Sequence, residues 1–97
     1  MTDKTNSRLH ATVNGHVQGV SFRYFVLEQA DHLDLTGWVR NLWNGAVEVT
    51  AEGSRQNLEQ LLLELKAGPP MAVVSDVDYE WQPYTSEFSG FDMTPTV

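Results

Sequence analysis

The segment from Gly15 to Arg23 holds the residue types best suited to binding phosphate. It reads Gly-His-Val-Gln-Gly-Val-Ser-Phe-Arg and lies where a strand is expected to end and a helix to begin. A loop that opens a helix presents several backbone N–H groups without intrahelical partners, and the helix dipole adds partial positive charge. An arginine in the first turn adds a rigid fork of donors that matches phosphate geometry. The segment therefore predicts a site for a small phosphate compound.

The same segment also has a purely structural interpretation, as a tight connection with Arg23 solvated at a helix end. However, a cation near a helix N-terminus is disfavoured by roughly 0.3–1 kcal/mol. The placement of Arg23 is better explained if an anion binds there.

A metal or other cofactor is not expected. The three histidines, His10, His16 and His32, match no ligand spacing, and the chain has no cysteine to join them. The loop residue His16 is the only one of the three placed where its titration could modulate phosphate binding. Without cysteine there is also no disulfide framework and no thiolate chemistry.

Composition narrows the class of protein. The chain has 97 residues, 41% apolar and 20% charged, which predicts one globular domain. Its apolar runs are too short to span a membrane, and Met1–Arg8 lacks the apolar core of a signal peptide, so a cytoplasmic protein is expected. The net charge of −7 opposes nucleic-acid binding and means that phosphate must be attracted locally, by Arg23 and backbone dipoles.

Hydrophobic periodicity predicts the elements that must position the loop. They are a strand from Leu9 to Val13, a helix from about Ser21 to about Leu33, a strand from Thr36 to Trp43, a hairpin turn at Asn44-Gly45, a strand from Val47 to Ala51, a helix between an N-cap at Ser54 and a stop at Gly68, a strand from Val73 to Trp81, and a short strand with Phe88, Phe91 and Met93. Pro95 favours an edge position for the last strand.

This order predicts an α+β fold: a ferredoxin-like βαββαβ sandwich with an added C-terminal edge strand. Two helices would cover one face of a mostly antiparallel sheet. Residues 9–97 are expected to form a single domain, with residues 1–8 as a polar N-terminal extension. The fold alone does not define an activity, because it hosts many unrelated ones.

Several motifs together resemble the acylphosphatase family. Besides the segment Gly15–Arg23, they are Gly37-Trp38-Val39-Arg40-Asn41, Asn44-Gly45, Glu48, Gly68-Pro69-Pro70 and Trp81. The resemblance covers about Leu9 to Phe91, with family-like order and spacing. It implies a metal-independent, cofactor-free hydrolase that splits acyl phosphates into a carboxylate and inorganic phosphate. The final residues, Asp92–Val97, depart from the apolar and basic ending common in the family, which leaves the pairing of the last strand open.

The resemblance also implies roles for individual residues. Arg23 would bind the phosphate and Asn41 would position the attacking water, within a cradle of backbone amides from about His16, Val17, Gln18, Gly19 and Val20. An asparagine amide can accept from water and donate to it, but it cannot act as a general base at neutral pH. Positioning and charge stabilisation supply most of what phosphoryl transfer needs. Arg40 should point to the opposite face of the sheet from Asn41.

Two other functions compete with hydrolysis. The alternative is a non-catalytic regulatory module that binds phosphate or another anion with the same loop. Nucleic-acid binding on the sheet is disfavoured because the aromatic and basic motif of an RNA-recognition domain is absent. The expected partners are a small-molecule acyl phosphate and inorganic phosphate as product inhibitor, with no nucleic acid and no membrane. A monomer is expected from the size of the chain and the lack of an evident interface motif.

Overall fold

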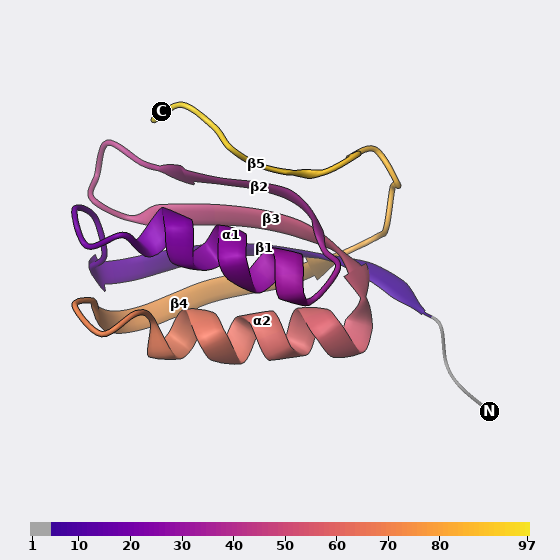
Figure 1. The fold of residues 1–97 in the computed structure, drawn as a ribbon, viewed down its shortest axis with the longest axis horizontal. Helices are drawn as coiled ribbons and strands as arrows, with labels where there is room; N and C mark the ends of the chain where they lie inside the picture. The colour runs from indigo at the N-terminus through magenta and orange to yellow at the C-terminus, as the bar shows by residue number, and fades with distance from the viewer. Residues whose placement is uncertain (1–4) are drawn as a thin grey trace.

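The computed structural model describes residues 5–97, which form one five-stranded sheet with both helices on the same side (Figure 1). In chain order the elements are β1 (Asn6–His16), α1 (Phe22–His32), β2 (Thr36–Asn41), β3 (Val47–Ser54), α2 (Arg55–Ala67), β4 (Val73–Gln82) and β5 (Phe91–Met93). The strand order is β4-β1-β3-β2-β5, and only the β2–β5 pair is parallel. The ferredoxin-like α+β prediction is confirmed, with β5 at an edge.

Strand alternation gives the sheet an apolar face and a polar face. On the helix side, Leu9, Ala11 and Val13 of β1 are fully buried and lie opposite apolar residues of β3. The helices cover this face with apolar side chains, namely Phe22, Val26 and Ala30 from α1 and Leu58, Leu61, Leu62 and Leu65 from α2. Burying each large apolar side chain contributes about 1.5–3 kcal/mol, so this layer is the main source of stability.

Local signals set the ends of α2 as predicted. The Ser54 side chain accepts a hydrogen bond from the Asn57 backbone N–H at 3.2 Å, which satisfies a donor that the helix leaves free. Gly68 follows the last turn with a φ of 71°, and its N–H donates to the Glu64 carbonyl.

Among residues 5–97, no helix is both long and apolar enough to cross a membrane.

Besides extensions of β1 to His16 and of β3 to Ser54, three predicted boundaries differ from the structure. Within the expected polar extension, Asn6, Ser7 and Arg8 are part of β1 and pair with β3, while residues 1–4 lie outside the described residues. The alternation of apolar residues does not reach these positions because they are polar. The first three residues of β1 are held instead by backbone pairing and by the hydrogen bond from Arg8 to buried Glu52.

The other two differences are at the ends of β2 and β5. β2 ends at Asn41 and not at Trp43, because the Leu42 N–H donates to the Ala46 carbonyl and makes the turn wider than Asn44-Gly45 alone. Phe88 lies outside β5, which begins at Phe91. Earlier in this segment the chain is held by a side chain, since Glu52 accepts hydrogen bonds from residues 85 and 86.

Candidate active site

The loop that follows β1 is shaped by close backbone contacts. Gly15 has a φ of 131° at an irregularity in the β1–β4 pairing, and a Cβ there would lie 2.1 Å from the Val73 carbonyl oxygen. Gly19 and Ser21 also have positive φ values, 75° and 65°. The chain therefore passes tightly along β4 and then turns sharply into α1, which only glycine at Gly15 allows.

The loop leaves backbone donors available. Within residues 5–97, no N–H of residues 17–21 is a donor in the backbone hydrogen bonds made outside helices and strands. Ser21 is the N-cap of α1, but its side chain makes no capping hydrogen bond. The loop donors and the positive end of the α1 dipole thus lie together, as an anion site requires.

Arg23 is the one cation without a partner in the described part of the chain. The others each have a carboxylate or an aromatic ring beside them: Arg8, Arg40, Arg55 and Lys66. For Arg23 neither an ion pair, a hydrogen bond nor a ring contact is found among residues 5–97. In a chain of net charge −7, an arginine without a carboxylate partner remains able to bind an external anion.

Arg23 and Asn41 line the same hollow, although they come from different elements. Its volume is about 240 Å³, and it is lined by Val17, Gly19, Ser21, Phe22, Arg23, Tyr24 and Asn41. Asn41 is opposite Val47, on the helix side of the sheet. Arg40 is opposite Glu48 on the other side and donates to it at 2.8 Å, as predicted from strand alternation.

Three residues predicted for the phosphate cradle do not line this hollow. His16 is exposed at the end of β1, and Val20 packs against the core. The Gln18 side chain donates to the carbonyls of Leu42 and Ala46, at 2.7 and 2.9 Å. The structure therefore brings Val17, Gly19 and Arg23 to the hollow and directs these three side chains elsewhere.

The structure adds three lining residues to those expected. Ser21 and Phe22 lie within the loop motif but had no assigned role, and Tyr24 lies outside the motif. Phe22 is buried in the core, whereas Tyr24 is 67% exposed while it lines the hollow. The signal for Tyr24 was available, because it follows Arg23 in the first turn of the helix. No local pattern indicates the left-handed backbone of Ser21, since a serine rarely adopts it.

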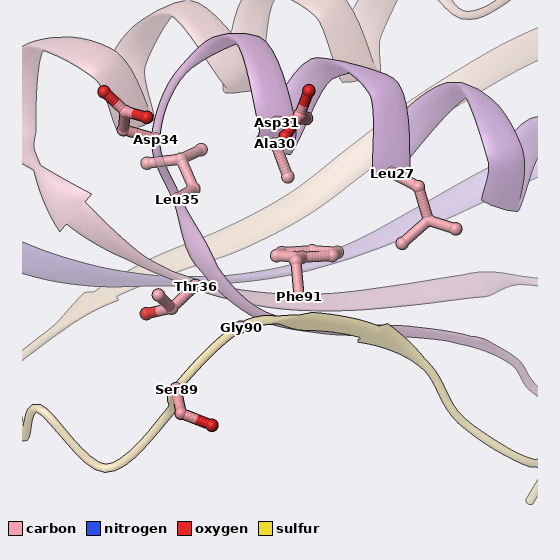
Figure 2. A pocket seen from close by; sticks show the side chains of 9 residues that line it. All are labelled: Leu27, Ala30, Asp31, Asp34, Leu35, Thr36, Ser89, Gly90 and Phe91. Carbon is pink, nitrogen blue, oxygen red and sulfur yellow. The ribbon is translucent and has the colours of Figure 1, made fainter.

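A larger hollow, about 520 Å³, lies at the other end of α1, between that helix, the start of β2 and β5. Figure 2 shows the Phe91 ring beneath Leu27 and Ala30, with the carboxylates of Asp31 and Asp34 pointing away from the ring. Two carboxylates and the negative end of a helix dipole disfavour a phosphate. Charge therefore favours the smaller hollow as the place for a phosphate.

No cluster of three or more His, Cys, Asp or Glu in residues 5–97 is arranged to hold a metal ion.

The fold is an α+β domain, and the smaller hollow lies at the N-terminus of α1. The acylphosphatase family model matches residues 9–93. An acylphosphatase of Pelotomaculum thermopropionicum is 49% identical over 87 residues, which is 90% of this chain and 95% of the relative. The chain belongs to the acylphosphatase family, and it is an enzyme of that class.

Solved structures agree with this assignment. An acylphosphatase from Coxiella burnetii superposes with a TM-score of 0.87 at 43% identity, covering 97% of this chain and all of that one (100%). Full-length HypF in its phosphate- and nucleotide-bound form superposes with a TM-score of 0.86 at 26% identity. That match covers 95% of this chain but only 12% of HypF. Family and fold together support hydrolysis of acyl phosphates.

Proposed function

We propose that this protein hydrolyses the carboxyl–phosphate bond of acyl phosphates without a metal ion, with the phosphate held by the loop and Arg23 and the water oriented by Asn41. The observation that carries the proposal is the shared hollow: Arg23 and Asn41 line it together with Val17 and Gly19. The unpaired loop N–H groups and the unpartnered arginine supply the donors that a phosphoryl group with negative oxygens requires.

The reaction needs little beyond this arrangement. The water oxygen forms a bond to phosphorus as the bond from phosphorus to the carboxyl oxygen breaks, and the electron pair leaves with the carboxylate. Asn41 accepts a hydrogen bond from the water through Oδ1 and donates through Nδ2, which fixes its direction of attack. The water proton passes to a phosphate oxygen or to the departing carboxylate. A carboxylate is a good leaving group, so no strong general acid is needed.

The first test is hydrolysis of benzoyl phosphate with a chelator present. The wild type is expected to turn over rapidly and to be inhibited competitively by inorganic phosphate. The Asn41→Ala variant is expected to lose roughly 100- to 1,000-fold in kcat, the usual cost of removing one positioned polar group, with KM little changed. Asn6→Ala is the matched control, because Asn6 is exposed at the opposite end of β1.

Each part of the proposal has a result that overturns it. Activity that the chelator abolishes would refute metal independence. Equal losses in kcat and in phosphate affinity for Asn41→Ala would refute a water-positioning role. The alternative expected from the sequence is a non-catalytic anion-binding module, and phosphate binding by folded protein without turnover would support it. A cytoplasmic location and a monomeric state remain predictions, as does the absence of nucleic-acid and membrane partners.

A further inference from the structure

The Gln18 side chain joins the phosphate loop to the hairpin that follows Asn41. Its Nε2 donates to the Leu42 carbonyl at 2.7 Å and to the Ala46 carbonyl at 2.9 Å, in a partly buried position. The same two carbonyls close the hairpin: the Leu42 N–H donates to Ala46 at 2.9 Å, and the Gly45 N–H donates to Leu42 at 3.1 Å. Gln18 therefore holds the first and last residues of this turn.

No strand pairing makes this connection. β1, which leads into the loop, pairs with β3 and β4, and β3 separates it from β2, which ends at Asn41. Among the side-chain hydrogen bonds of residues 5–97, only those of Gln18 join residues 17–21 to the hairpin. Strand pairing reaches Asn41 from β1 only through β3, from Val13 to Val47 to Asn41, and the Gln18 amide adds a direct link between the loop and the residue after Asn41.

We propose that Gln18 is a positioning residue, which fixes Asn41 relative to the phosphate cradle; this inference rests on the proposed function. The primary amide of Gln18 supplies two N–H donors to two carbonyl oxygens from one nitrogen, without adding a charge. Without it, the loop loses its direct link to the hairpin, and the phosphate cradle can shift relative to Asn41, which the sheet holds in place. A displacement of about 1 Å at a reacting group can lower a rate about 100-fold.

The test compares Gln18→Glu and Gln18→Met with the wild type. Glu keeps the length but faces the carbonyls with no N–H donor, and Met removes the hydrogen bonds with little change in size. Both variants are expected to lose roughly tenfold to 100-fold in kcat for benzoyl phosphate. The inhibition constant of inorganic phosphate is read from the uncharged Gln18→Met variant, in which it should change little. Gln60→Met is the control, because it removes an exposed side-chain hydrogen bond on α2.

A double-mutant cycle shows whether Gln18 acts through Asn41. In an Asn41→Ala background, Gln18→Met is expected to cause no further loss in kcat, because the group it positions is already gone. Losses that multiply would overturn the inference, and so would a phosphate inhibition constant that rises as much as kcat falls. Urea denaturation verifies that each variant is folded under assay conditions; if Gln18→Met does not fold, the isosteric Gln18→Glu carries the same cycle.

The proposed function and the positioning role fail in different ways. If the folded wild type does not hydrolyse benzoyl phosphate, the proposed function is wrong and the role of Gln18 is wrong with it. If the wild type is active and both Gln18 variants keep its kcat, only the positioning role is wrong.

Discussion

The two faces of the sheet use polar side chains in opposite ways. On the helix side, Arg23 and Asn41 line the hollow, and neither side chain has a hydrogen-bond or ion-pair partner within the described residues. On the open side, Arg40 and His10 both contact Glu48, at 2.8 and 2.7 Å, and Arg8 contacts Glu52 at 2.8 Å. The polar side chains that hold the fold are thus paired with one another, while Arg23 and Asn41, which are proposed to act on substrate, are left without partners.

Strand β2 shows this contrast within two consecutive residues. Arg40 is paired on the open face and stacks on Trp38, with its guanidinium carbon 4.4 Å from the ring centre. Asn41, the next residue, faces the hollow. Substitutions of the polar residues at the hollow should therefore reduce activity more than stability, and substitutions of the paired charges on the open face should do the reverse.

The largest expected effect comes from Arg23→Ala. Removing the cation that stabilises the charge on a transferring phosphoryl group costs roughly 10³- to 10⁵-fold in rate, and we expect kcat/KM for benzoyl phosphate to fall within that range. Phosphate inhibition should weaken in parallel. The free energy of unfolding should change by less than about 1 kcal/mol, because Arg23 has no partner to lose. Enzyme kinetics and urea denaturation measure the two effects.

Arg55→Ala is the control for Arg23→Ala. Arg55 lies on α2, contacts Glu59 at 3.3 Å and covers the Trp81 ring at 3.6 Å. Its loss should leave kcat/KM unchanged and lower stability slightly. If Arg23→Ala instead destabilised the fold by several kcal/mol, the distinction between free and paired charges would not hold.

The second effect, on the open face, comes from Glu52→Gln. The Glu52 side chain is fully buried and accepts hydrogen bonds from Arg8, from Thr85 and from the Ser86 backbone N–H. A glutamine would turn an NH₂ group toward some of these donors, and we expect a loss of about 3 kcal/mol in the free energy of unfolding. The kcat of the folded protein should be unchanged.

Glu80→Gln is the matched control for Glu52→Gln, since Glu80 is exposed on β4. Its effect on stability should stay within about 0.5 kcal/mol. A Glu52→Gln variant as stable as the wild type would show that the network is not what anchors the segment before β5. A variant that kept its stability but lost kcat would reverse the comparison between the two faces.

The strands and helix ends that the sequence predicts correctly are those with a local physical signal. Alternating apolar residues predicted β1, β3 and β4. The N-cap at Ser54 and the stop at Gly68 were correct because a cap is set by its neighbouring residues. The family resemblance implied that Arg23 and Asn41 belong to one site, and the structure places both residues at the same hollow. Periodicity alone could not have done so.

The contacts that the sequence did not predict join residues far apart in the chain. Glu52 bonds Thr85 and Ser86, which lie 33 and 34 residues away, and no pattern around Glu52 indicates that it is buried. Gln18 was expected to contribute only its backbone N–H, yet its side-chain amide donates to carbonyls 24 and 28 residues away. Both contacts depend on the tertiary packing of elements that come together from distant parts of the chain.

The smallest expected effect is the pH dependence of stability that Glu48 contributes. Burial by itself raises the pKa of Glu48, but hydrogen bonds from His10 and Arg40 outweigh it, so the pKa lies below its ordinary value of 4.5. A carboxyl with a lowered pKa stabilises the fold above its unfolded pKa and loses that contribution as pH falls through the folded value. Glu48→Gln should therefore cost about 1 kcal/mol at neutral pH, because the site is partly exposed.

That cost should shrink as the pH falls below about 4.5, where the Glu48 carboxyl of the unfolded chain takes up a proton before that of the folded protein does. Glu52 titrates in the same direction, since its pKa is also lowered, but it is present in both proteins and cancels in their difference. Urea denaturation of wild type and Glu48→Gln from neutral pH to about pH 3 measures this difference. A difference that stays constant over the whole range would mean that Glu48 keeps the same protonation in the folded and unfolded chain, and the open face would then owe its stability to packing and not to paired charge.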